Sequence, residues 1–149
     1  MVKTALITGA TSGIGRATAH EFAKHGIKLI LCGRRQERLD TIKKALSKQT
    51  NVHTLNFDVS DKVAVFDAIN SLPEAFKNID ILINNAGNAH GLDPIQDGSL
   101  DDWDKMMDIN VKGLLYVSKA IIPNMTKRKS GHIINIGSSA GKEVYPNGN

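Results

Sequence analysis

The sequence has 149 residues, of which 41% are hydrophobic and 23% are charged, values ordinary for one soluble globular domain. It contains no apolar run long enough to cross a membrane and no secretory leader, so we expect a cytoplasmic protein. Despite a net charge of +4, the basic residues are scattered among acidic ones, which argues against a nucleic-acid partner. The single cysteine, Cys32, permits no internal disulfide, and the five histidines lack metal-ligand spacing, so no metal site is predicted.

A glycine-rich turn joins the first predicted strand to the first predicted helix. The apolar segment from Val2 to Thr8 favours a strand, and the segment from Ile14 to His25 has helical spacing. One stripe of that helix is expected to comprise Ile14, Ala17, Thr18 and Phe22. Between strand and helix lie Gly9, Gly13 and Gly15. Glycine permits a tight turn and close approach of backbone N–H groups to an anionic pyrophosphate, and the helix N-terminus favours negative charge. The pattern therefore predicts a dinucleotide site, with a turn that binds no ligand as the alternative.

Strand and helix patterns continue to alternate along the chain. Further strands are predicted at Ile27 to Cys32, Val52 to Phe57, Ile79 to Ile83 and His132 to Ile136. Helices are predicted at Gln36 to Lys48, around Val65 to Leu72 with a break at Pro73, and from a Ser99–Asp102 capping box to Pro123. Such alternation is typical of a parallel sheet covered by helices on both faces. The predicted fold class is thus α/β, a doubly wound, Rossmann-like parallel sheet, with residues 1–149 forming one dinucleotide-binding domain.

Polar side chains follow the predicted strands, at the edge where ligands bind in open α/β sheets. Arg34 and Arg35 follow the second strand, where two guanidiniums suit the 2′-phosphate of NADP and no acidic residue is present to hold a ribose hydroxyl. A solvated surface pair is the alternative for these arginines. Asp58 and Val59, after the third strand, could contact an adenine ring.

Four successive motifs then resemble those of the short-chain dehydrogenase/reductase family, in that family's order and spacing. They are Thr8–Gly15, Asn84–Gly87, Asn110–Gly113 and Ile136–Gly141. The resemblance implies that NADP(H) is bound by Gly9, Thr11, Ser12, Gly13, Ile14, Gly15, Arg34, Arg35, Asp58, Val59 and Asn85. It also implies two catalytic residues, Asn110 holding a water in a proton relay and Ser138 orienting the substrate. For Asn110, a buried amide that bonds backbone is the alternative, and Asn84 is expected to be structural.

The family's central tyrosine and lysine, four residues apart, are not present. Family spacing from Ser138 would put this pair just beyond Asn149, and Tyr145 is no substitute because it lies too close to Ser138 and is followed four residues later by Asn149 instead of lysine. The last strands of the family's sheet are also missing, which leaves an unpaired edge. We therefore expect the chain to be part of a longer polypeptide, and to bind cofactor without turnover when alone.

The resemblance implies an NADP(H)-dependent oxidoreductase that interconverts a secondary alcohol and a ketone on a small-molecule substrate. Within the family, the chain is most similar to dehydrogenases of 3-hydroxy acids and serine-like compounds, and family members are commonly tetramers. The main alternative is a non-catalytic dinucleotide-binding or regulatory module. A second alternative is a hydrolase with Ser139 as nucleophile, since Gly137 to Gly141 also has Gly-x-Ser-x-Gly spacing, although no histidine follows it.

Overall fold

The computed structural model describes residues 2–143, which form a parallel sheet of five strands in the order β3-β2-β1-β4-β5. The strands are β1 (Thr4–Ile7), β2 (Lys28–Gly33), β3 (Val52–Asn56), β4 (Ile81–Asn84) and β5 (His132–Asn135). The helices are α1 (Gly13–Lys24), α2 (Gln36–Leu46), α3 (Lys62–Asn70), α4 (Leu100–Met106) and α5 (Leu114–Arg128). A π-helical segment, η3 (Met107–Gly113), joins α4 to α5, and 3₁₀ turns lie at η1 (Glu74–Phe76), η2 (Ile95–Asp97) and η4 (Ser139–Gly141). The predicted α/β fold is confirmed.

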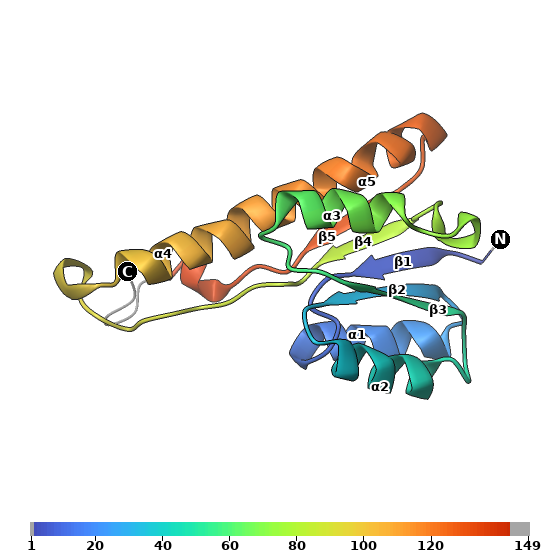
Figure 1. The fold of residues 1–149 in the computed structure, drawn as a ribbon, viewed down its shortest axis with the longest axis horizontal. Coiled ribbons are helices and arrows are strands. Elements are labelled where there is room, and N and C mark those ends of the chain that lie inside the picture. The colour runs from blue at the N-terminus through green and yellow to red at the C-terminus, as the bar shows by residue number, and fades with distance from the viewer. Residues whose placement is uncertain (1, 144–149) are drawn as a thin grey trace.

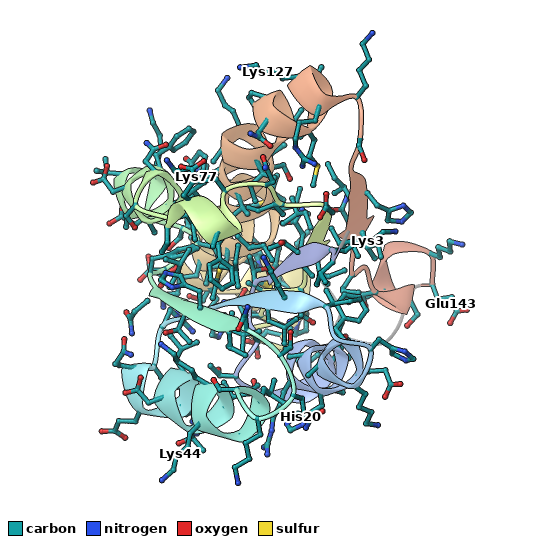
Figure 2. The ribbon with its side chains drawn as sticks, turned by 90° about the vertical axis from the view of Figure 1, so that its right-hand side faces the viewer. Lys3, His20, Lys44, Lys77, Lys127 and Glu143 are labelled. Atoms are coloured by element: carbon teal, nitrogen blue, oxygen red, sulfur yellow. The ribbon has the colours of Figure 1, made fainter. Side chains whose placement is uncertain are left out.

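Helices cover both faces of the sheet, with α1 and α2 on one side and α3 and α5 on the other (Figure 1). Residues in β1 alternate between the two faces, and because all are buried, the strand is apolar on both. Ala5 and Ile7 pack in the core beneath α1 and α2, whereas Leu6 belongs to the core beneath α3 and α5. Charged side chains such as Lys44, Lys77 and Lys127 extend outward, away from these cores (Figure 2).

The strand order reverses beside β1, which pairs with β2 on one side and with β4 on the other. The chain segments leaving β1 and β4 therefore diverge to opposite faces of the sheet. In open parallel sheets, this switch point is where a crevice forms at the carboxyl ends of the strands.

Helix α1 buries a different stripe from the one predicted. Its buried residues are Gly15, Ala19 and Ala23, whereas Ile14 is 59% exposed. Small side chains let α1 approach the sheet closely, and Ile14 instead lies beside the pocket described below. Ile14 therefore does not belong to the buried stripe of α1, but it lines the pocket, as expected from the family resemblance.

The predicted long helix forms, but with an interruption and a later end. Ser99 caps α4, its hydroxyl accepting a hydrogen bond from the backbone N–H of Asp102 at 3.4 Å. The helix then continues through η3 into α5 and passes Pro123, where the sequence predicted its end. Pro123 lies on the exposed side, where water can solvate the carbonyl whose helical hydrogen bond the proline removes.

An ion pair ties the end of α5 to the amino-terminal edge of the sheet. The Arg128 guanidinium donates to the Asp80 carboxylate at 3.0 Å and to the Ile79 carbonyl. The other Asp80 oxygen accepts from the backbone N–H of Thr4 at 2.9 Å. These contacts hold the start of β1, the start of β4 and the carboxyl end of α5 together, opposite the edge that carries the predicted site.

Strand β5 forms an edge of the sheet, as predicted. All four of its residues are exposed, and Ile133, Ile134 and Ile136 retain more than a third of their surface accessible. A parallel sheet normally buries such residues on both faces. This edge is therefore an unpaired apolar strand within the described residues.

Candidate functional site

An open pocket of about 1060 Å³ lies along the carboxyl-terminal edge of the sheet. It is lined by residues from the segments that follow all five strands, including Gly137 after β5. Twelve of the thirteen predicted site residues line it: Gly9, Thr11, Ser12, Gly13, Ile14, Arg34, Arg35, Asp58, Val59, Asn85, Asn110 and Ser138. The thirteenth, Gly15, does not.

The glycine-rich turn exposes backbone to the pocket. Gly9 and Gly13 have positive φ values of 64° and 51°, which glycine adopts without strain. A Cβ at Gly13 would meet no atom within 4 Å, so this glycine leaves open space where α1 begins. Ser12 occupies the N-cap position without a side-chain capping bond, and the first turn of α1 contains no acidic residue. The N-terminus of α1 is thus available to an anionic group.

Gly15 acts in packing instead. A Cβ there would overlap the Asn85 amide and lie 2.6 Å from the Gly9 carbonyl oxygen. The Asn85 amide donates to the carbonyls of Thr8 and Gly9, at 2.9 and 3.2 Å. Asn85 therefore braces the glycine-rich turn from the end of β4 while also lining the pocket.

Thr8 is a further site residue that motif reasoning did not single out. Its buried hydroxyl accepts hydrogen bonds from the backbone N–H groups of Asn85 and Ala86, at 3.0 and 2.9 Å. These bonds join residues 77 and 78 positions apart, so they fasten the ends of β1 and β4 together across the switch point. Thr8 opens the recognised motif, and its position there was the signal available in the sequence.

An ion pair joins two of the residues that line the pocket. The Arg34 guanidinium donates to Asp58 Oδ2 at 3.2 Å, joining the segments after β2 and β3. Asp58 Oδ1 accepts from the backbone N–H of Ser60 at 3.0 Å and from its hydroxyl at 2.7 Å. Burial opposes ionisation of Asp58, but the bonds from Ser60 and Arg34 outweigh it and hold the pKa of the carboxyl below its usual 3.8. Asp58 is therefore ionised at neutral pH.

Asn84 forms a buried polar cluster with β5 and α5. Its amide donates to Ser118 Oγ at 3.0 Å and to Asn135 Oδ1 at 2.9 Å. Asn84 Oδ1 itself is buried and has no hydrogen-bond partner among residues 2–143. The cluster holds α5 and β5 on β4, which agrees with the structural role expected of Asn84.

Asn110 lies within the π-helical segment η3. Its Oδ1 accepts from the backbone N–H of Asn88 at 2.9 Å, and its Nδ2 donates to the Asn88 carbonyl at 2.8 Å. The alternative for Asn110 was a buried amide that bonds backbone. Asn110 does bond backbone, but it is exposed and not buried. Oδ1 accepts one hydrogen bond here and has a second lone pair free for water. A π-helix is frequent at functional sites.

Ser138 follows β5 and lines the pocket with an extended backbone. Its hydroxyl oxygen accepts from the backbone N–H of Ala140 at 3.2 Å, which leaves the O–H free to donate. The rival nucleophile, Ser139, begins only the short 3₁₀ turn η4, and no helix follows it up to residue 143. Tyr145 lies outside the described residues.

Other predictions concern cysteine, metals and membranes. Cys32 is buried, as expected of a small core residue, and burial raises the pKa of its thiol far above the usual range. Over residues 2–143, no three side chains of His, Cys, Asp or Glu gather as a metal site would require. In the same part of the chain, no helix combines the length and apolar character needed to cross a membrane.

The pocket residues fit a dinucleotide phosphate. Gly13 leaves space beside an uncapped helix N-terminus, and two arginines line the same pocket. Helix N-terminal N–H groups and guanidinium donors are both groups that bind phosphate oxygens. The pocket therefore offers two kinds of anion-binding group, and its lining also includes the apolar side chains of Val59 and Ile109.

Comparison with known proteins finds relatives that match this chain over nearly its whole length. The NADP-dependent 3-hydroxy acid dehydrogenase YdfG of Salmonella typhimurium is 46% identical over 144 residues, which cover 97% of this chain and 57% of that protein. Sulfoacetaldehyde reductase 2 of Chromohalobacter salexigens is 49% identical over 142 residues, covering 95% of this chain and 56% of the relative. The chain thus spans a little over half the length of the curated relatives it matches.

Solved structures show the same fold. Serine dehydrogenase from Escherichia coli matches with a TM-score of 0.90 and 44% identity, over 97% of this chain and 66% of that one. An NAD⁺-bound xylitol dehydrogenase matches with a TM-score of 0.92 and 34% identity, over 97% of this chain and 56% of the other. The family described as short chain dehydrogenase matches residues 3–149. On this evidence, the chain belongs to the short-chain dehydrogenase family.

Proposed function

We propose that this chain forms the cofactor-binding portion of an NADP(H)-dependent oxidoreductase that interconverts a secondary alcohol and a ketone. The observation that carries the proposal is a single pocket lined both by a glycine-rich helix N-terminus and by Arg34 and Arg35. The first suits a pyrophosphate and the second a 2′-phosphate. A structure of serine dehydrogenase with NADP⁺, 44% identical to this chain, supports the choice of cofactor.

Within this proposal, the adenine end of the cofactor lies by Asp58 and Val59, and the pyrophosphate lies over the turn from Gly9 to Ile14. Thr11 and Ser12 lie in the same turn and supply further donors for phosphate oxygens, while Ile14 packs against the bound cofactor. Asn85 holds the turn in shape near the cofactor ribose. The cofactor supplies hydride chemistry at its nicotinamide, and the protein supplies binding and orientation.

Two residues are proposed to act on the substrate. The Ser138 hydroxyl donates a hydrogen bond to the substrate oxygen, which holds the carbonyl or hydroxyl carbon in position for hydride transfer. Asn110, fixed by its two bonds to the Asn88 backbone, holds a water through the free lone pair of Oδ1. This water would relay a proton to and from the site.

The proposed substrate is a 3-hydroxy acid or a serine-like hydroxy compound. The named activities of the relatives support it, because 3-hydroxy acid, serine and sulfoacetaldehyde substrates are all small and carry an anionic group. The test is a screen of the protein, expressed at the full length of its relatives, against 3-hydroxy acids and serine while NADPH absorbance is followed. Turnover supports the proposal. Cofactor binding without turnover on any of these compounds favours the alternative, a non-catalytic dinucleotide-binding module.

We also propose that the protein is a homo-oligomer, a tetramer by analogy with its family. The support is a row of exposed apolar side chains on η3 and α5, comprising Met107, Val111, Leu115 and Ile122. Such a row is typical of a surface that is covered in an assembly. Light scattering of the full-length protein tests the proposal, since a monomeric mass would contradict it.

A further inference from the structure

Arg34 and Arg35 both line the pocket but differ in their interactions with the rest of the protein. Arg34 bonds to Asp58, whereas Arg35 has no ion-pair partner among residues 2–143. Both arginines follow β2, and Arg35 occupies the N-cap position of α2. The two guanidiniums therefore differ in what orients them, which the sequence Gly33-Arg34-Arg35 does not reveal.

The bond between Arg34 and Asp58 depends on how the carboxylate is turned. Ser60 gives Asp58 Oδ1 two hydrogen bonds, and this leaves Oδ2 facing Arg34 at 3.2 Å. Arg34 has 64% of its side chain exposed, and Asp58 has 34%. An arginine so exposed would otherwise sample many rotamers, and a single bond to a fixed acceptor restricts it to the pocket edge. The remaining guanidinium N–H groups stay available, because only Nη1 is engaged.

On this geometry, and resting on the proposed NADP(H) function, we infer that Ser60 is a positioning residue for cofactor selection. Through Asp58, it orients Arg34 toward the 2′-phosphate that distinguishes NADP from NAD. Ser60 does not itself line the pocket, so it acts without touching the cofactor. An oriented guanidinium loses less freedom on binding, and pre-organisation of this kind raises affinity for the ligand that uses it.

Ser60 is a sharper target than Asp58 for testing this inference. Replacing Asp58 would remove a negative charge beside the phosphate and would also alter the proposed adenine contact. Ser60→Ala keeps the carboxylate and its charge, and keeps the backbone N–H of residue 60, while it removes only the 2.7 Å hydroxyl bond. A change in the cofactor preference of Ser60→Ala is then due to a change in the orientation of the Asp58 carboxylate.

The experiment measures dissociation constants of NADP⁺ and NAD⁺ by calorimetry for the full-length protein and its variants. Ser60→Ala is expected to lower the preference for NADP⁺ about 3- to 10-fold, the loss of one hydrogen bond. Ser60→Thr, which keeps the hydroxyl, is expected to retain the preference. Ser71→Ala is the matched control, because it removes an exposed hydroxyl that bonds the Ala68 carbonyl at the end of α3.

A double-mutant comparison tests whether Ser60 acts through Arg34. The effect of Ser60→Ala is expected to vanish in an Arg34→Ala background and to persist in an Arg35→Ala background. Three outcomes would overturn the inference about Ser60 while leaving the proposed cofactor in place. They are an unchanged NADP⁺ preference in Ser60→Ala, an equal loss of NADP⁺ and NAD⁺ affinity in that variant, and an effect of Ser60→Ala that persists without Arg34. Absence of any preference in the unaltered protein would instead overturn the proposed cofactor, and the inference with it.

Discussion

Substitution of Gly13 separates the effect of backbone strain on stability from the effect on cofactor affinity. Its φ of +51° is costly for any residue with a Cβ, yet a Cβ there would meet no atom within 4 Å. We expect Gly13→Ala to cost ~1–2 kcal/mol in left-handed strain. Reduced freedom of the unfolded chain offsets ~0.4–1 kcal/mol of this. The net loss of folding stability is therefore only about 1 kcal/mol.

The effect of Gly13→Ala on cofactor binding should be larger, because the methyl group would occupy space beside the N-terminus of α1. Loss of one charge-assisted hydrogen bond to a phosphate is worth about 1.5–3 kcal/mol, or roughly 10- to 100-fold in affinity. Gly26 supplies the matched control. It has a φ of +68°, a Cβ there would also meet no atom within 4 Å, and it lies at the other end of α1.

The assay combines urea unfolding with calorimetric titration of NADP⁺ on full-length Gly13→Ala and Gly26→Ala proteins. Both are expected to lose similar stability, and only Gly13→Ala is expected to lose affinity. If Gly13→Ala binds NADP⁺ as tightly as Gly26→Ala does, the glycine-rich turn does not hold the pyrophosphate.

Three further predictions concern catalysis, stability and pH. Ser138→Ala is expected to lower kcat about 100-fold or more while NADPH affinity is kept, whereas Ser139→Ala leaves kcat near its original value; an unchanged kcat in Ser138→Ala would remove Ser138 from the proposed mechanism. Arg128→Met, which leaves the Asp80 carboxylate without its ion pair, should reduce the free energy of unfolding by about 1–2 kcal/mol in urea titrations, and an unchanged midpoint would refute that role. Burial lowers the pKa of His53 below 6.5, so the unfolded chain binds the proton more readily and stability should fall as pH drops below 6.5; His53→Gln should flatten this dependence, and an identical pH profile would contradict it.

Much of the fold could be predicted because the strands are short apolar runs and the helices between them have clear helical spacing. The pocket could also be predicted in outline, since residues that follow parallel strands meet at one edge of the sheet. Ile14 shows the limit of this reasoning. Helical spacing puts it on one stripe with Phe22, whereas the family resemblance puts it at the cofactor, and the structure exposes it beside the pocket.

Contacts between segments distant in the chain could not be predicted from the sequence. The hydrogen bonds between Thr8 and the segment after β4 join residues 77 and 78 positions apart, and no local sequence pattern predicts them. The π-helical segment around Asn110 was also missed, because a single widened turn barely changes the spacing of apolar residues along a helix. The role of Ser60 depends on the direction in which one carboxylate is turned, which is a property of side-chain geometry.

The central claim is that the pocket at the carboxyl ends of the strands holds NADP(H), with its 2′-phosphate at Arg34 and Arg35. The most direct measurement is a comparison of the dissociation constants of NADPH and NADH for the full-length protein and for the Arg34→Ala, Arg35→Ala double variant. We predict that the unaltered protein binds NADPH at least about 10-fold more tightly and that the double variant loses this preference. Equal dissociation constants for the two cofactors in the unaltered protein would contradict the claim.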